Sequence, residues 1–256
     1  MLIRVRRRRF FAHMVSADWS VNELQPGIAR LPFEIRRVAR AAELEAVVQQ
    51  RIAGYRLGSR KSAIDAFDFA DNCIVLGAFD KENGQCLGSI RLVLGDRGPN
   101  EITAFVAFDE PWRTLTKIEA RRFVVPRTIY SMKVKVMLMK ALYAVAESQR
   151  IGAIVATSAE GLASTYRMMH FQDLQPGGLT VRPPGARKPA TVVAIEVGKL
   201  KGLWRDDRDL ANFYRIWFEQ QHPDLHLEPS ARNPLAVLRD EFLREEPLPA
   251  PFVPAG

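Results

Sequence analysis

Five charged residues in the middle of the chain have types and spacing that could do chemistry. Asp65 and Asp68 lie three apart in IDAFDF, Arg91 lies inside the apolar run CLGSIRLVL, and Glu119 and Arg122 lie three apart in KIEARRFVVP. A carboxylate can accept a proton as a general base, and a guanidinium can hold a carboxylate through two parallel hydrogen bonds. The order predicts a polar constellation threaded through strands that otherwise form the core.

The same five charges also have a purely structural interpretation. Exposed ion pairs contribute only about 0–1 kcal/mol, whereas charges inside a protein must be paired whether or not they act. The charges could therefore form a buried salt-bridge network that braces the loop of Asp65 and Asp68 on the sheet. The sequence leaves both interpretations open, and both can hold together.

Hydrophobic periodicity predicts the elements that position these residues. Strands are expected at 33–39, 72–79, 86–94, 116–125, 153–157 and 191–197, and helices at 41–53, 129–149 and 160–169. The Asn83-Gly84 pair predicts a hairpin turn between the second and third strands. This order predicts a mixed α+β fold in three layers, with a central, mostly antiparallel sheet flanked by helices.

Composition and charge suggest how the 256 residues are organised. The net charge of +8 favours an acidic partner, and five arginines among the first nine residues supply much of it. Residues 1–30 are predicted to be a basic flexible arm and 31–200 a single domain. A C-terminal extension is expected at 201–256, with helices around 210–220 and 234–244 and a proline-rich tail.

The two cysteines and the absence of long apolar runs indicate a cytoplasmic protein. Cys73 and Cys86 both lie in apolar strand-like runs, so they are predicted to be buried, reduced thiols and not a disulfide or a metal site. No run of eighteen apolar residues is present, and the N-terminal arginines are not followed by the apolar segment of a secretory signal.

The element order and the charged motifs together resemble the GNAT-type N-acyltransferase fold over roughly residues 33–197. Within that fold, the chain is most similar to the N-acyl amino acid synthases and the N-acyl-homoserine-lactone (autoinducer) synthases. The lactone synthases have similar D-x-x-D, G-x-x-R-L and E-x-S-R-F motifs. Here Arg121 stands at the serine of the last motif, and no L-P-T follows Arg91-Leu92. Both differences favour the amino acid synthases.

The resemblance implies that a substrate amine attacks the carbonyl carbon of a thioester. Glu119 is then the candidate general base, because an amine that is mostly protonated at neutral pH must lose a proton. A backbone N–H of Phe123, Val124 or Val125 would hold the oxyanion, where this fold separates two neighbouring strands. Tyr166 could donate a proton to the leaving thiolate, as a tyrosine near this place does in other members of the fold.

The other motif residues are expected to bind the substrate: Asp65, Asp68, Arg91 and Arg122. The two arginines could hold a substrate carboxylate, hold Glu119 or anchor the loop of the two aspartates. The sequence does not choose among these roles.

The segment after the fourth strand indicates the acyl donor. Acetyl-CoA-dependent members of the fold carry a glycine-rich turn there, whose amides hold a pyrophosphate, but this chain reads VVPRTIYSMKVK without glycine. The expected donor is therefore an acidic acyl carrier protein rather than acyl-CoA, with Arg127 and Lys133 as its contacts. No bound cofactor and no metal are expected.

Two alternatives stay open. A lactone synthase would use S-adenosylmethionine as its second substrate. A non-enzymatic protein could bind an anionic membrane or nucleic acid through the arginines of the arm, although nucleic acid is not the expected partner. The amine, the acyl length and the oligomeric state are not predicted.

Overall fold

The computed structural model describes most of the chain between residues 30 and 243. The described residues are 30–98, 101–104, 106–158, 163, 166–167, 169–175, 179–182, 189–207, 214, 218–219, 221–227 and 232–243. Nearly all of the predicted basic arm, most of the helices predicted at 160–169 and 210–220, and the whole proline-rich tail lie outside these residues.

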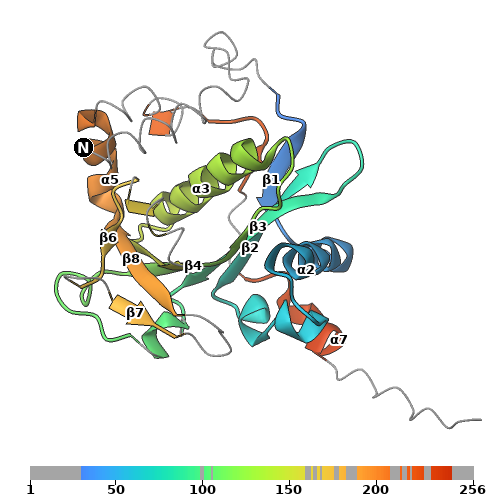
Figure 1. Cartoon of the computed structure of the whole chain (residues 1–256), viewed down its shortest axis with the longest axis horizontal. Coiled ribbons are helices and arrows are strands. Elements are labelled where there is room, and N and C mark those ends of the chain that lie inside the picture. The colour runs from blue at the N-terminus through green and yellow to red at the C-terminus, as the bar shows by residue number, and fades with distance from the viewer. Residues whose placement is uncertain are drawn as a thin grey trace, which may run out of the picture.

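Nine strands form one mixed sheet in the order β6-β8-β5-β4-β3-β2-β1-β9, and β7 also pairs with β8 (Figure 1). The strands are β1 Phe33–Arg37, β2 Cys73–Asp80, β3 Cys86–Leu94, β4 Lys117–Val124, β5 Ala153–Ser158, β6 Gln172–Asp173, β7 Leu179–Val181, β8 Ala190–Glu196 and β9 Leu225–His226. The β4–β5 and β1–β9 pairs are parallel, and the other neighbours are antiparallel.

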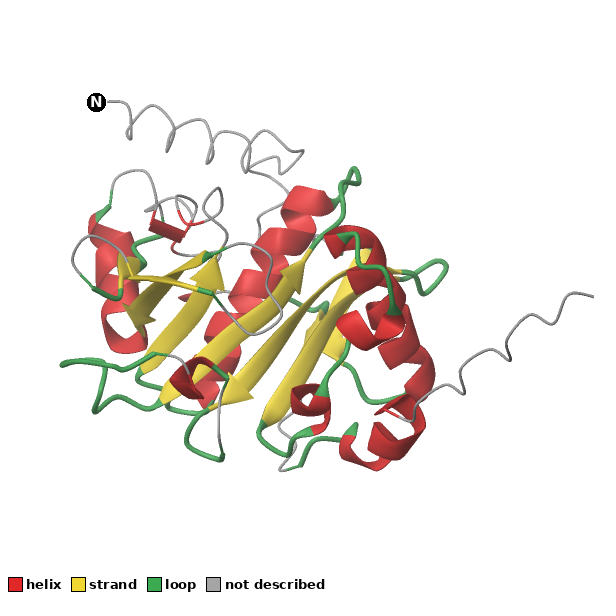
Figure 2. Ribbon diagram, turned by 60° about the horizontal axis from the view of Figure 1, so that its bottom comes forward, coloured by secondary structure: helices red, strands yellow, loops and turns green. Residues whose placement is uncertain are grey.

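Helices cover both faces of this sheet, which confirms the predicted three layers (Figure 2). The helices are α2 Ala41–Tyr55, α3 Ser131–Ser148, α5 Val197–Asp206 and α7 Arg239–Leu243, with 3-10 turns η1 Arg60–Ser62, η2 Ala66–Phe69, η3 Ile102–Ala104 and η5 Ala236–Leu238. None of the helices in the described ranges has the length and apolarity needed to cross a bilayer.

The structure confirms the six predicted strands and the two helices at 41–53 and 129–149, with small shifts at their ends. β6, β7, β9 and α5 were not predicted from the sequence. Strands of two or three residues show no period, and α5 starts at Val197 directly after β8, with no turn residue between them.

Asp80–Gly84 form the predicted hairpin turn, in which Gly84 has a φ of 72° that suits glycine. Cys73 and Cys86 are buried and unpaired, as predicted.

Alternation along the strands separates the core into two faces. Leu92 of β3 belongs to the largest apolar cluster, together with Leu138 of α3. Val75 of β2 belongs to a second cluster with Val47 of α2. The sheet is thus apolar toward α3 on one face and toward α2 on the other.

A third apolar cluster lies under the long connection between β3 and β4. Ile102 and Trp112 of the connection belong to this cluster, together with Val155 of β5 and Ala194 of β8. Val155 alternates with Ile154, which faces α3, so the third cluster lies on the α2 face. On the α2 face, β4 lies between the second and third clusters. Its polar side chains on this face therefore lie between two apolar regions.

The C-terminal segment contacts this face as well. Asn233 donates a hydrogen bond to the carbonyl oxygen of Asp68 at 2.9 Å, and the Phe242 ring packs on Phe69 at a centroid distance of 6.2 Å. The division into arm, domain and extension stays a prediction.

Candidate active site

A β-bulge in β4 decides which charged side chains meet. Arg91 of β3 lies opposite Arg121, but Ser89 lies opposite Val124, so β4 advances three residues where β3 advances two. Arg122 sits in this bulge with a φ of 52°, a left-handed conformation that a non-glycine residue rarely adopts. The bulge turns Arg122 to the same face as its neighbour Arg121, whereas regular alternation would separate them.

The loop of the two aspartates is tied to β3 and β4 by ion pairs. The Arg91 guanidinium lies 2.6 Å from Asp65 Oδ1 and 3.1 Å from Asp68 Oδ2, and Arg122 lies 2.7 Å from Asp65 Oδ2. Arg51 of α2 reaches Asp68 Oδ1 at 2.8 Å. The sequence left open whether Arg91 and Arg122 hold a substrate carboxylate, Glu119 or the aspartate loop. In the structure both arginines pair with the aspartates of the loop.

The aspartates also organise their own turn. Asp65 is the N-cap of η2 and accepts the Phe67 N–H at 2.9 Å, while the Asp65 N–H donates to Asp68 Oδ2 at 3.1 Å. This capping box satisfies donors at the helix start and holds both carboxylates toward the arginines.

Glu101, in the connection after β3, completes the group and was missed by the sequence analysis. One of its oxygens contacts Arg91 and the other lies 2.5 Å from the Arg121 guanidinium. We call the assembly the charge network, and it consists of Arg51, Asp65, Asp68, Arg91, Glu101, Glu119, Arg121 and Arg122. Four carboxylates balance four guanidinium groups, as buried charges require.

Glu119 lies at the bottom of the charge network with no exposed surface. Its Oε2 accepts the Ile102 N–H at 3.0 Å. Its Oε1 lies 3.5 Å from the Arg121 guanidinium and accepts no hydrogen bond from the described residues. Burial raises the pKa of Glu119, and Arg121 and the Ile102 N–H oppose that rise. A raised pKa makes a carboxylate a stronger base.

The side chains of the charge network differ in their exposure to solvent, from fully buried residues to partly exposed ones. Glu119, Asp68, Arg91 and Arg51 are fully buried. The exposed fractions are 33% for Asp65, 21% for Arg122, and 15% for both Arg121 and Glu101. A small molecule at this surface would first meet the second group of residues.

The parallel strands β4 and β5 stop pairing beside the network. Their ladder runs from Lys117 opposite Ala153 to Ala120 opposite Ala156, and β5 then continues to Ser158 on β8 alone. Phe123 lies near the end of β4 and Val125 directly after it, and both are partly buried and pack against the α3 cluster. These residues therefore flank the separation of two neighbouring strands that the sequence analysis expected.

Tyr166 is buried and packs edge-on against Phe171, with ring centroids 5.1 Å apart. Burial raises the pKa of Tyr166, and the nearby Tyr55 raises it further. Tyr55 in turn donates its hydroxyl hydrogen to the Phe123 carbonyl at 3.1 Å. A phenol in this setting stays protonated at neutral pH.

The turn between β4 and α3 uses several of its own amides. The Thr128 N–H donates to Ser131 Oγ, the Tyr130 N–H to Thr128 Oγ1 at 3.2 Å, and the Ser131 N–H to the Thr128 carbonyl at 3.2 Å. Arg127 of this turn is exposed, and Lys133 in the first turn of α3 is partly buried. A pyrophosphate at this helix start would have to displace these internal acceptors.

A family model described as N-acyl amino acid synthase FeeM matches residues 47–196, more than half of the chain. The chain belongs to the FeeM family of N-acyl amino acid synthases. It is accordingly an N-acyltransferase.

Solved structures agree with the membership in the FeeM family. FeeM itself, an N-acyl amino acid synthase from uncultured soil microbes, aligns with a TM-score of 0.56 at 15% identity, covering 66% of this chain and 93% of FeeM. The acyl-homoserine lactone synthase BjaI, described as CoA-dependent, aligns with a TM-score of 0.54 at 14% identity, covering 80% and 98%. The fold is that of the GNAT acyltransferases. No curated protein matches the sequence.

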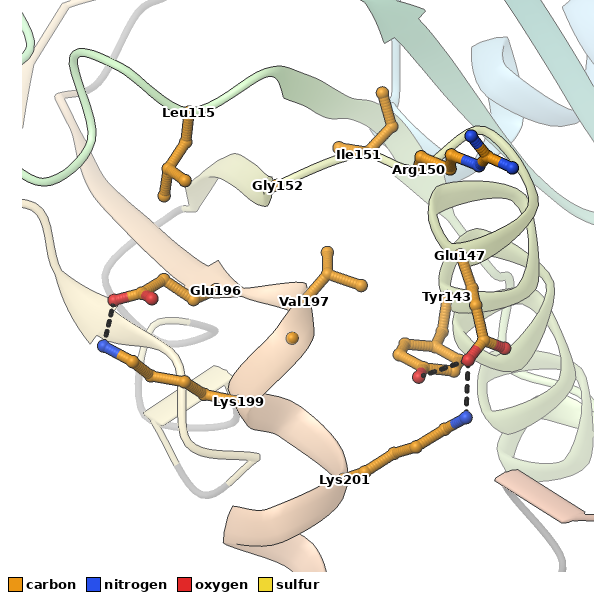
Figure 3. A pocket seen from close by; sticks show the side chains of 11 residues that line it. Leu115, Tyr143, Glu147, Arg150, Ile151, Gly152, Glu196, Val197, Lys199 and Lys201 are labelled. Atoms are coloured by element: carbon orange, nitrogen blue, oxygen red, sulfur yellow. Dashed lines mark hydrogen bonds and ion pairs between the residues drawn. The ribbon is translucent and has the colours of Figure 1, made fainter.

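A pocket of about 480 Å³ lies at the N-terminal ends of β4 and β5, away from the charge network (Figure 3). Leu115 and Gly152, which precede the two strands, line it together with Val197 at the start of α5. Ion pairs from Glu196 to Lys199 and from Glu147 to Lys201 flank the hollow. The pocket does not adjoin the charge network.

Replacing Arg121 with serine, the residue of the lactone-synthase motif, should shift the pH dependence of acyl transfer to higher pH. The Arg121 guanidinium lowers the pKa of Glu119, so its removal raises that pKa further. Initial rates across a pH series would measure the shift. Arg167→Ser, which breaks the exposed pair with Asp173, is the control. An unmoved profile would contradict a role for Glu119 ionisation in the reaction.

Proposed function

We propose that this FeeM-family enzyme moves a fatty acyl group from a carrier-protein thioester to the amino group of an amino acid or a similar small amine. The observation that carries the proposal is the fully buried Glu119 of the charge network, whose pKa is raised by burial. It lies beside the point where the pairing of β4 with β5 ends. A cytoplasmic location belongs to the same proposal.

The proposed step forms an amide and releases a thiol. The amine nitrogen attacks the thioester carbon, the carbon–sulfur bond breaks, and the amine loses a proton to Glu119. Because Glu119 has no exposed surface, this proton travels through water. Tyr166 supplies a proton to the leaving thiolate, because its raised pKa keeps the phenol protonated at neutral pH. Backbone N–H groups at Phe123 to Val125 hold the oxyanion.

The four remaining motif residues divide between two roles in the proposal. Asp65 and Arg122 are partly exposed, so they can touch the ammonium and carboxylate groups of an amino acid. Asp68 and Arg91 are fully buried, so they act by holding the loop in place. The motifs then have both a structural and a chemical role: the buried pair braces the loop, and the partly exposed pair binds the substrate.

Two features support a carrier protein as the donor. Three amides of the β4–α3 turn, those of Thr128, Tyr130 and Ser131, are already used internally, which leaves a poorer cradle for a pyrophosphate. Arg127 in this turn, together with Lys133 and Lys135 near the start of α3, gives the region positive charge, which suits an acidic partner. BjaI is described as CoA-dependent, so acyl-CoA is the alternative donor that the experiment must separate.

Product analysis tests the proposed function. The native chain is expressed in a bacterial host, and solvent extracts are analysed by mass spectrometry beside an empty-vector culture. New N-acyl amino acids are expected, and their masses would identify both the amine and the acyl chain. Homoserine lactones would move the assignment to lactone synthesis, and a purified protein inactive with every acyl thioester tested would contradict the proposal.

Charge reversal at Arg127 should weaken use of the carrier protein. Arg127→Glu is expected to raise the KM for an acyl carrier protein roughly tenfold and to leave kcat unchanged, because a like charge repels the acidic partner. Steady-state kinetics with purified acyl carrier protein would measure it, with Arg205→Glu on α5 as the control. Equal KM values for both variants, or a preference for acyl-CoA, would contradict the carrier as donor.

A further inference from the structure

Gln50 of α2 joins three elements at the end of β4. Its side chain is buried, with 6% of its surface exposed. The Nε2 group donates to the Val124 carbonyl at 2.9 Å, and Oε1 accepts the Ser89 hydroxyl of β3 at 2.9 Å. Because Ser89 supplies a hydrogen to Oε1, the amide nitrogen is the end of Gln50 that faces Val124.

Helix α2 lies very close to the end of β4 at Gly54. A Cβ atom on Gly54 would lie 2.3 Å from Val124 Cγ2, so only glycine lets the helix come this close. Tyr55, the next residue, bonds to the neighbouring Phe123 carbonyl at 3.1 Å. Two residues five apart on α2 therefore hold two successive carbonyl groups of β4.

The orientation of the Val124 carbonyl determines the orientation of the next amide. The Val124 oxygen would lie 3.2 Å from a Cβ atom on Gly88 of β3, so this carbonyl points toward β3 and α2. In a trans peptide the N–H of the following residue points the opposite way. The Val125 N–H is thus directed away from β3, toward the side of β4 where the ladder with β5 has ended.

The Val125 N–H is also available. It donates no hydrogen bond to another backbone or side-chain acceptor within the described part of the chain. An amide of fixed direction, unused by the fold and beside separated strands, is the kind of donor that stabilises an oxyanion.

We propose that Gln50 is a positioning residue that aims the Val125 N–H at the oxyanion of acyl transfer. The inference rests on the proposed function, and it deepens it by selecting Val125 among the three amides. Gln50 acts through the Val124–Val125 peptide: it holds the carbonyl, and Ser89 sets which end of its amide does so. The hydrogen bond to the carbonyl also polarises the peptide, which strengthens the N–H as a donor.

The test compares two substitutions at Gln50 with a control on the same helix. Gln50→Glu keeps the shape but, when ionised, presents only acceptors to the Val124 carbonyl, and Gln50→Met removes the hydrogen bonds while filling the space. Val47→Ala loosens the packing of α2 in the second cluster but leaves both hydrogen bonds of Gln50 in place. Steady-state kinetics, melting temperatures and the amide NMR shift of Val125 are measured for each.

For both Gln50 variants, kcat should fall about 100-fold, the typical effect of a misplaced oxyanion donor, with KM for both substrates unchanged and the Val125 shift displaced. Val47→Ala should lower the melting temperature with kcat unchanged. An active native enzyme whose Gln50 variants keep their kcat, or lose no more than Val47→Ala, would overturn this inference alone. A native chain without acyl transfer would instead overturn the proposed function, while the Val125 shift still reports whether Gln50 holds the peptide.

Discussion

Arg91→Met is expected to lower the free energy of unfolding by about 3–5 kcal/mol, the cost of removing one partner from a buried ion pair. Methionine fills most of the volume but removes one of the two arginines that pair with the buried carboxylate of Asp68, and it takes one partner from Asp65 and from Glu101. Urea unfolding followed by circular dichroism would measure the loss.

Arg122→Met is the matched control for this measurement. Arg122 is partly exposed, and Asp65 keeps Arg91 as a partner when Arg122 is removed. The expected loss is below about 1 kcal/mol, because solvent reaches this partly exposed pair and screens it. If Arg91→Met cost no more than Arg122→Met, the charge network would not brace the fold.

Glu119→Gln is expected to lower kcat by roughly 10²–10⁴-fold, the usual contribution of a general base. The amide oxygen of glutamine can still accept the Ile102 N–H, so the packing is retained while the proton acceptor is lost. Kinetics with purified enzyme, at constant acyl donor and amine, would measure the fall. A variant that keeps its kcat would exclude Glu119 as the base.

The pH dependence gives this substitution a second readout. The native rate should fall with falling pH as Glu119 takes up a proton, at a pH above the ordinary value of 4.5 because burial raises its pKa. The same shift affects stability. Between 4.5 and the raised pKa the folded state binds more protons than the unfolded state, so the contribution of Glu119 to stability falls as pH rises. Glu119→Gln should remove both effects.

The two substitutions separate the two interpretations of the charged motifs. Arg91 tests whether the charges hold the loop of Asp65 and Asp68 on the sheet, and Glu119 tests whether they serve the reaction. Because Arg91 and Glu119 are both fully buried, exposure alone does not distinguish their roles. If Arg91→Met lowers stability without a proportional loss of kcat, Arg91 has the structural role. If Glu119→Gln lowers kcat without a proportional loss of stability, Glu119 has the chemical role.

The sequence by itself determined the order of the main elements and the set of residues worth examining. The runs that became β2, β3 and β4 alternate or are continuously apolar, and α3 has a clear helical period, so local pattern was sufficient. Arg91 attracted notice because a charge inside an apolar strand must find a partner. The resemblance of three motifs in order led to the acyltransferase fold.

Only the tertiary structure decided which of these residues meet. Glu119 and Arg122 are three apart, yet Arg122 pairs with Asp65 and the guanidinium nearest Glu119 is that of Arg121. Arg51, Glu101 and Gln50 reach their partners from a helix and a loop whose placement no local pattern encodes. The physical reason is that period and propensity act over a few residues. Partner choice in this site instead depends on a bulge at Arg122 and on contacts between residues far apart in the chain.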